Sequence, residues 1–300
     1  RIETTEFSYP IEDVGLSPSG FSIVYTPGNT HHRKLFGIRI YTDEGVTGEY
    51  VGGNSPGLAQ INMVAQYLIG KNAFNRERHW VELKRALRKY DRMGIGPLDV
   101  ALWDLAGKAY GAPIHEMLGT YRTRIPAYAS TYDADLRGGL DSPEKFADFA
   151  EACYEQGFRA FKVHGWGSEE WRDLDREIAT VHAIGERVGD RMDLMLDPAC
   201  QFETFADAVK VGRACDEWDF FWYEDPYRDA GISQHGHRKL RQLIDTPLLQ
   251  TEHVRGLEPK SDFVAAEATD FVRADPEYDG GITGVMKTAH MAEAYGLDVE

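Results

Sequence analysis

Three carboxylates stand at the ends of successive apolar runs in the second half of the sequence. The runs D-L-M-L-D, F-F-W-Y-E and P-L-L-Q-T-E end at Asp197, Glu224 and Glu252. Runs of this kind are typical of parallel β-strands, whose carboxyl ends meet at one edge. Three like charges placed together there repel one another unless a cation lies between them. Oxygen ligands favour a hard divalent ion, so the pattern predicts a Mg²⁺ site, with Mn²⁺ as the alternative.

A lysine and a histidine end an earlier run of the same kind, F-R-A-F-K-V-H. Lys162 and His164 are two residues apart, so in a strand their side chains point to the same face. A lysine beside a metal ion can have its pKa lowered and act as a base. A histidine can move a proton near neutral pH. We therefore predict that both are catalytic; the alternative for Lys162 is a surface lysine whose stem packs on the protein.

These runs alternate with helix-like segments, which is typical of a parallel α/β fold. From His164 to Asp275, successive ends lie 23 to 33 residues apart, a spacing that fits consecutive βα units. In a βα barrel the chemistry lies at the carboxyl ends of the strands. The first strand is predicted at 125–131, and the helix signal Ser142-Pro143 follows it.

The first 124 residues read as a separate α+β domain. Its expected elements are strands at 21–26 and 34–42 and helices at 57–69, 74–90 and 97–110. A polar loop is expected between the two strands, at 27–33. We therefore predict a domain over 1–124 and a barrel domain over 125–300 that is incomplete at its C-terminal end.

Composition narrows the class of protein. The formal net charge of −16 argues against binding to nucleic acid and to anionic membranes. The three cysteines are too few and too scattered for a disulfide framework. The sequence shows neither a signal peptide nor an apolar run of membrane-spanning length. We therefore predict a cytoplasmic enzyme. We also expect a homo-oligomer.

The order Lys-x-His, Asp, Glu, Glu, Asp, followed by Gly-Gly-x-Thr-Gly at 280–284, resembles the enolase superfamily. Within it the chain is similar to the mandelate racemase/muconate lactonizing enzyme group and to its acid-sugar dehydratases. The segment G-P-L-D-V-A-L-W-D-L-A-G-K at 96–108 adds to the likeness. The resemblance implies a TIM-type (β/α)7β barrel with an N-terminal α+β capping domain. Because the sequence stops at L-D-V-E, which reads as the middle of a strand, we expect the natural protein to continue.

The resemblance implies a small-molecule carboxylate as the substrate and chemistry at the carbon next to its carboxylate. In enolase-superfamily sites a Lys or His base works with Mg²⁺, which stabilises an enediolate. Among such reactions we favour dehydration of a sugar acid to a 2-keto-3-deoxy acid. The first alternative is racemisation or epimerisation of a 2-hydroxy or related acid. A non-catalytic sugar-acid-binding relative is a remote alternative, against which the intact lysine and carboxylates argue.

The resemblance also gives Asp275 a role. It corresponds to an aspartate that orients a catalytic histidine on the following strand, and by the family's spacing that histidine falls beyond Glu300. A buried aspartate paired with a nearby arginine is the alternative. Many relatives have Lys-x-Lys where this chain has Lys162 and His164, which argues against racemisation by two lysines.

Substrate contacts are expected from two further places. The resemblance makes the segment 15–33 a specificity loop, so His32 and Arg33 are predicted to meet a carboxylate or hydroxyl of the substrate. A flexible polar loop is the equally weighted alternative. His253 directly follows Glu252 and is predicted to contact the substrate as well.

Overall fold

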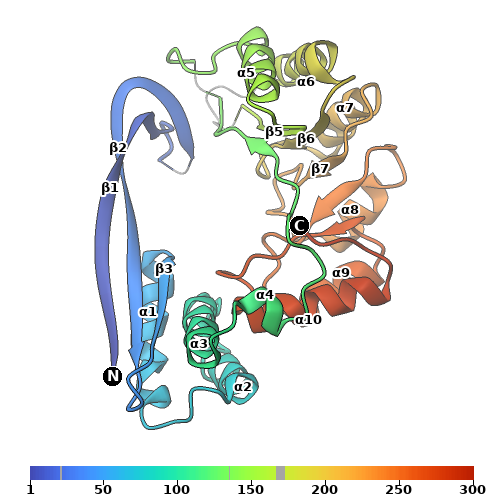
Figure 1. The fold of residues 1–300 in the computed structure, drawn as a ribbon. Helices are drawn as coiled ribbons and strands as arrows, with labels where there is room; N and C mark the ends of the chain where they lie inside the picture. Colours follow the sequence, from blue (N-terminus) through green and yellow to red (C-terminus); the bar gives the residue numbers. More distant parts are fainter. Residues whose placement is uncertain (21, 135, 167–172) are drawn as a thin grey trace.

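The N-terminal part of the chain is a three-stranded antiparallel sheet with helices beside it (Figure 1). The computed structural model describes residues 1–20, 22–134, 136–166 and 173–300. The elements of this part are β1 Ile2–Leu16, β2 Ile23–Tyr41, β3 Thr47–Gly52, α1 Ser55–Val64, the 3₁₀ helix η1 Ala65–Leu68, α2 Arg76–Ala86, α3 Ile95–Tyr110 and α4 Ile114–Met117. The predicted α+β character is confirmed. Phe21, the first residue of the strand predicted at 21–26, lies outside the described residues.

The second strand is longer than predicted. β2 includes residues 27–33, so His32 and Arg33 lie in the ladder with β1 and not in a loop. The cause is β1, a strand of fifteen residues that offers backbone partners to residues 30–33. A register shift between Glu12 and Val14 accommodates the polar run P-G-N-T. The predicted loop at 27–33 is therefore wrong.

A core between β2 and α3 holds this part together. The buried side of α3 is one stripe made by Leu98, Ala101, Leu102 and Leu105, as the helical period predicts. Phe36 and Ile38 of β2 belong to the same cluster. A Cβ on Gly48 of β3 would lie 2.1 Å from the carbonyl oxygen of Ala101, so glycine allows the close approach of sheet and helix.

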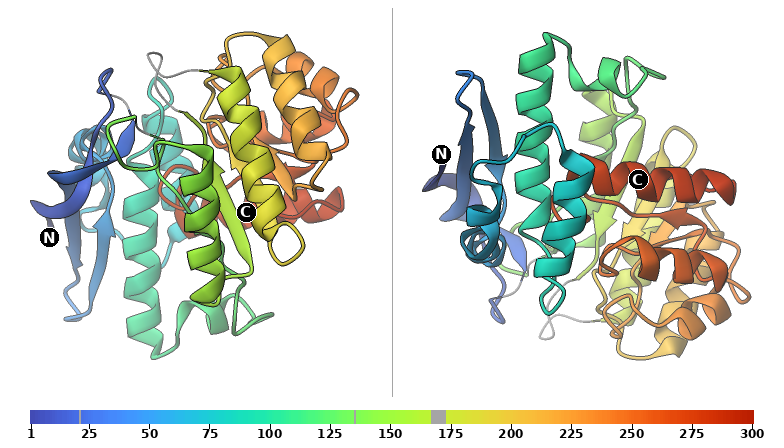
Figure 2. Two further views of the ribbon diagram at one scale, coloured as in Figure 1. Left: turned by 90° about the horizontal axis from the view of Figure 1, so that it is seen from above. Right: turned by 90° about the horizontal axis from the view of Figure 1, so that it is seen from below.

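The rest of the chain is a parallel sheet in sequence order, with a helix after each strand (Figures 1 and 2). The elements are β4 Ala129–Ser130, α5 Pro143–Glu155, β5 Ala160–His164, α6 Leu174–Val188, β6 Asp193–Asp197, α7 Phe205–Asp216, β7 Trp222–Glu224, α8 Gln234–Leu240, β8 Leu248–Gln250, α9 Leu257–Ala265, β9 Phe271–Val272 and α10 Gly281–Ala294. Val299 pairs with Val272 in parallel, which starts the seventh strand. This is the order of a TIM-type barrel. Among the residues described, no helix has the length and apolar character needed to cross a membrane.

The parallel strands are shorter than the sequence pattern predicts. β4 covers two residues of the expected 125–131, β8 ends two residues before Glu252, and β9 ends three residues before Asp275. After the end of β9, aspartate side chains accept backbone hydrogen bonds in place of a neighbouring strand. The Asp275 backbone N donates to Asp279 Oδ2 at 3.0 Å, and the Glu277 N donates to Asp275 Oδ1 at 2.6 Å. These bonds turn the chain away from the sheet into a loop.

The tip of the β1–β2 hairpin reaches the barrel beside the end of β4 (Figure 1). Val24 forms an isolated parallel bridge with Asp133. The Tyr132 backbone N donates to the hydroxyl of Tyr25 at 3.1 Å. The hairpin therefore covers the carboxyl end of the first barrel strand, where a specificity segment is expected. The exact boundary at 124/125 stays a prediction.

Helix α3 also lies against α10, which joins the cap to the barrel (Figure 2). The buried Asp99 carboxylate accepts from the Thr283 N at 2.9 Å and from the Thr283 hydroxyl at 2.7 Å. The indole of Trp103 donates to the same hydroxyl at 2.9 Å. Burial raises the pKa of Asp99 to about 7, although the hydrogen bonds from Thr283 act in the opposite direction.

This aspartate is expected to make stability depend on pH. Because the pKa of Asp99 is raised in the folded state, its contribution is complete below about pH 4 and is lost as pH rises through about 7. The loss is on the order of 4 kcal/mol at most. In Asp99→Asn the free energy of unfolding is expected to fall less between these pH values than in the parent, as urea titrations at each pH would measure. Parallel curves for the two proteins would contradict this.

Candidate active site

The three carboxylates predicted from the sequence come together at the carboxyl ends of neighbouring strands. One ligand oxygen each of Asp197, Glu224 and Glu252 lies within 4.8 Å of the others. Asp197 ends β6 and Glu224 ends β7, while Glu252 follows β8. The first two are buried, with relative exposures of 5% and 1%. In a Mg²⁺ shell with bonds of about 2.1 Å, neighbouring oxygens lie about 3 Å apart and opposite ones about 4 Å. The cluster therefore needs little adjustment to hold such an ion.

The chemistry of this cluster also fits a hard cation. All three donors are carboxylate oxygens, which Mg²⁺ and Mn²⁺ prefer. Glu224 Oε1 is buried and has no hydrogen-bond partner within the described part of the chain. An orphaned buried carboxylate oxygen is costly, and coordination to a cation would satisfy it. The metal roles of these residues stay a prediction that the geometry supports.

Lys162 lies inside the cluster. Its Nζ is 3.0 Å from Asp197 Oδ2 and 2.9 Å from Glu224 Oε2. The ammonium is buried, and burial alone would lower the pKa of Lys162. The negative charges of Asp197 and Glu224 outweigh burial and raise that pKa. Lys162 thus has the inward direction predicted from its place in the strand, and its single positive charge contacts two of the carboxylates.

His164 shares this face and is held in one orientation. Its Nδ1 donates to the Thr131 carbonyl oxygen at 2.7 Å, and its Nε2 lies 3.1 Å from Asp197 Oδ2. Burial lowers the pKa of His164, but the charge of Asp197 and its hydrogen bond outweigh burial and raise it. Because the Thr131 carbonyl fixes Nδ1 as a donor, Nε2 is the atom able to release or accept a proton.

An arginine that received no role from the sequence completes the cluster. Arg273 Nε is 2.8 Å from Glu300 Oε2, 3.6 Å from Glu252 Oε2 and 3.8 Å from Glu224 Oε1. The hydroxyl of Tyr128 donates to the other oxygen of Glu300 at 2.5 Å. The sequence did contain a sign of this role. Arg273 lies two residues before Asp275, so in a strand both side chains point to the same, inward face.

Asp275 lies past the end of β9, in the turn described above. Its carboxylate accepts from a backbone N of the same turn. The nearest arginine in sequence, Arg273, pairs with Glu300 and not with Asp275. The role of Asp275 in orienting a histidine beyond residue 300 stays a prediction.

The residues predicted to touch substrate lie in two different places. His32 and Arg33 are exposed on β2. Arg33 pairs with Tyr9 of β1 and Tyr25 pairs with Val14, so roughly 17 Å of strand separates Arg33 from Tyr25, the residue that contacts the barrel. These two residues therefore lie away from the part of the hairpin that contacts the barrel. His253 lies next to Glu252 in sequence, and its Nε2 is 3.3 Å from Asp225 Oδ2. The substrate roles of all three stay predictions.

Two sequence families match the chain. Residues 145–300 match the family described as "Enolase C-terminal domain-like". Residues 18–119 match "Mandelate racemase / muconate lactonizing enzyme, N-terminal domain". The first of these matches alone spans more than half of the 300 residues.

Several curated relatives are named as enzymes of acid sugars. The D-gluconate dehydratase of Thermoproteus tenax is 29% identical over 213 residues, 68% of this chain and 41% of that protein. The L-talarate/galactarate dehydratase of Salmonella typhimurium is 27% identical over 243 residues, 79% of this chain and 58% of that protein. The D-galactarolactone cycloisomerase of Agrobacterium fabrum is 28% identical over 271 residues, 87% and 69% of the two chains. The chain spans less than two thirds of the length of the first two relatives.

Solved structures have the same fold. The D-glucarate dehydratase of Agrobacterium tumefaciens, complexed with magnesium, superposes with a TM-score of 0.88 at 26% identity, covering 100% of this chain and 79% of that one. The 3,6-anhydro-D-galactonate cycloisomerase of Zobellia galactanivorans gives 0.81 at 25% identity, with 100% and 78% covered. With its antiparallel cap and its TIM-type barrel, the chain belongs to the mandelate racemase/muconate lactonizing enzyme group of the enolase superfamily.

Proposed function

We propose that this protein dehydrates a sugar acid by removing the proton next to the substrate carboxylate. The observation that carries the proposal is the position of Lys162 Nζ, within 3.0 Å of two of the three converging carboxylates. A divalent ion held by Asp197, Glu224 and Glu252, Mg²⁺ in the first place and Mn²⁺ in the second, would supply positive charge where negative charge develops on the substrate. Superfamily membership and the magnesium complex of a structural relative support this assignment.

Lys162 is the residue proposed to take the α-proton. Two opposing influences act on the pKa of its ammonium: burial lowers it, while Asp197 and Glu224 raise it. When a bound cation balances the charge of these carboxylates, burial becomes the dominant influence. The pKa of Lys162 then moves down, toward the range of a general base. The same contacts that hold the ammonium also fix the position of Nζ.

Loss of the β-hydroxyl requires a general acid. His164 Nε2 lies on the same side as Lys162 and can carry a proton, since Nδ1 is occupied by the Thr131 carbonyl. The histidine expected to follow Asp275 would act from the opposite side of the barrel. If the α-proton and the β-hydroxyl leave from the same face of the substrate, Lys162 and His164 are the expected pair. If they leave from opposite faces, the second histidine is the expected general acid.

A second candidate is isomerisation through the same proton removal. Cycloisomerases occur beside the dehydratases among the relatives. Returning the proton, with no hydroxyl lost, converts the dehydratase chemistry into racemisation or epimerisation. Because this chain has Lys162 and His164 where many relatives have two lysines, dehydration is the first candidate.

A screen of sugar acids tests the proposal. Purified protein with Mg²⁺ is incubated with aldonic and aldaric acids, and 2-keto acid formation is measured by semicarbazone absorbance. We expect at least one acid to give a 2-keto acid, with activity lost on chelation and restored by Mg²⁺ or Mn²⁺. Exchange of the α-proton with D₂O, without a keto acid, would identify an isomerase. Binding of acids with neither exchange nor turnover would contradict an enzymatic role.

A further inference from the structure

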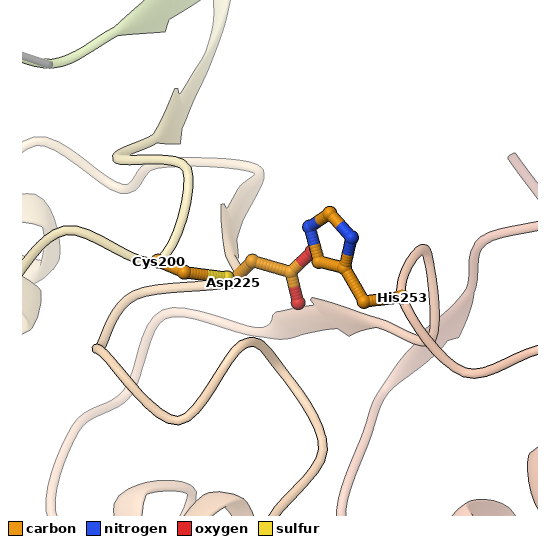
Figure 3. Close-up of side chains that lie close together, drawn as sticks. All are labelled: Cys200, Asp225 and His253. Atoms are coloured by element: carbon orange, nitrogen blue, oxygen red, sulfur yellow. The ribbon is translucent and has the colours of Figure 1, made fainter. Parts of the chain in front are cut away.

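The three strand ends that carry the carboxylate cluster also carry a second group of ligand-type side chains. Cys200 follows Asp197 by three residues, Asp225 follows Glu224 directly, and His253 follows Glu252 directly. The thiol sulfur, one carboxylate oxygen and one ring nitrogen of this second group lie within 4.8 Å of one another. Figure 3 shows Asp225 between Cys200 and His253, with its carboxylate pointing toward the imidazole.

Hydrogen bonding within the protein leaves Asp225 only partly satisfied. The residue is 1% exposed, and its Oδ2 lies 3.3 Å from His253 Nε2. Its Oδ1 is buried and lacks a hydrogen-bond partner in the described residues. Gly231 lies beside this oxygen, and a Cβ there would come within 2.4 Å of Oδ1. A buried carboxylate oxygen without a donor is costly, and the contact of Oδ2 with His253 leaves Oδ1 unsatisfied in the part of the chain that the structure describes.

Backbone contacts fix the cysteine next to the aspartate. The Cys200 N donates to the Asp225 carbonyl oxygen at 2.7 Å. Just beyond, Phe202 forms a parallel bridge with Tyr227, so the loops after β6 and β7 stay paired. The cysteine is therefore held in position by two strand-like contacts and does not approach Asp225 by side-chain flexibility alone.

The surroundings of Cys200 are negative and argue against a free nucleophile. Burial first, and then the charges of Asp225 and Asp197, raise the pKa of the Cys200 thiol. Reactive cysteines need the opposite, an electropositive setting that stabilises the thiolate. A negative setting instead attracts a cation, and a bound metal ion deprotonates the thiol that ligates it.

We propose that Cys200, Asp225 and His253 form a second metal site, selective for a transition-metal ion such as Zn²⁺ and separate from the all-oxygen cluster. Sulfur, nitrogen and oxygen donors suit Zn²⁺, whereas Mg²⁺ avoids thiolate and imidazole. Zinc bonds of about 2.0 to 2.1 Å place tetrahedral nitrogen and oxygen ligands about 3.3 Å apart, which matches the 3.3 Å between His253 Nε2 and Asp225 Oδ2. Three protein ligands leave the fourth position for water or a substrate group.

A metal ion can reach this site from the side of His253. Its side chain is 39% exposed, while that of Asp225 is 1% exposed. An ion can therefore enter past the imidazole without unfolding of the loops. The proposal gives His253 a role different from the direct substrate contact predicted from sequence.

Cobalt spectroscopy tests the site without an activity assay. Metal-free protein is saturated with Mg²⁺ and titrated with Co²⁺. We expect a near-ultraviolet thiolate-to-cobalt band and visible bands of tetrahedral Co²⁺, both saturating at a single equivalent and both removed by Zn²⁺. Co²⁺ bound by the carboxylate cluster gives no thiolate band, because that cluster contains oxygen alone.

Matched variants identify the ligands. Cys200→Ser is expected to remove the thiolate band, and Cys153→Ser, which changes another cysteine of the barrel, to retain it. His253→Gln, at a half-exposed position, is expected to weaken Co²⁺ binding by at least about 10-fold. Asp197→Asn disables the carboxylate cluster and is expected to retain the thiolate band. The result for the second metal site is therefore independent of whether the proposed dehydratase function is correct. Absence of a thiolate band in folded parent protein, or its persistence in Cys200→Ser, would overturn the proposal.

Discussion

Replacing Asp197 by asparagine is expected to weaken the binding of Mn²⁺ or Mg²⁺ by at least about 100-fold. The change removes one negative charge from a cluster whose ligand oxygens lie within 4.8 Å of one another. It leaves an amide oxygen able to accept from the Ala199 N, a bond of 2.9 Å in the parent, so the local turn is expected to persist. Turnover is expected to fall by about 10³-fold or more, because metal-ion charge stabilisation is worth several kcal/mol.

The same strand supplies a matched control. Asp193 lies at the other end of β6 and is exposed, so Asp193→Asn removes an equal charge far from the carboxylate cluster. Calorimetric titration with Mn²⁺ compares the two variants with the parent, and circular dichroism verifies the fold. Unchanged Mn²⁺ affinity in folded Asp197→Asn would contradict the role of the carboxylate cluster.

Much of the fold follows from patterns that are local in sequence. The 23- to 33-residue spacing of strand ends predicts the βα units, and Ser142 is the helix N-cap that the Ser-Pro signal indicates. The extent of β2 does not follow in this way. Its P-G-N-T run has residues that favour turns, and Pro27, Gly28 and Asn29 have no ladder partner on β1, but β1 pairs with the residues on both sides of them and the strand continues. Such pairing depends on residues distant in sequence, which local propensity does not report.

The candidate site was predictable where a strand fixes the direction of a side chain. Lys162 and Asp197 lie in strands, and their period of two gives their direction. Arg273 has an inward position by the same rule, but its ion pair with Glu300 arises only when the seventh strand aligns beside β9. The contact of Cys200 with Asp225 depends on loops that pair after the strands have ended, and no sequence period describes such loops.

Replacing Lys162 by alanine is expected to lower turnover by at least about 100-fold, the lower end for loss of general acid–base catalysis. Metal binding is expected to survive, because the ammonium is a positive charge beside Asp197 and Glu224 and its removal leaves both carboxylates free to ligate. Affinity for Mn²⁺ is therefore expected to remain equal or to increase. This opposite effect on binding separates Lys162→Ala from Asp197→Asn, in which binding and turnover fall together.

A second variant of Lys162 tests whether the cavity left by alanine, and not the missing ammonium, causes the loss of activity. Lys162→Met retains most of the buried side-chain volume and is expected to lose turnover as Lys162→Ala does. Exchange of the substrate α-proton with D₂O, followed by proton NMR, reports on the proton-removal step itself and is expected to slow in both variants. His164→Asn, measured beside them, is expected to retain exchange and lose elimination if His164 supplies the general acid. Full turnover in folded Lys162→Ala would move the base to His164, whose Nε2 lies 3.1 Å from the same Asp197 oxygen and has the required direction.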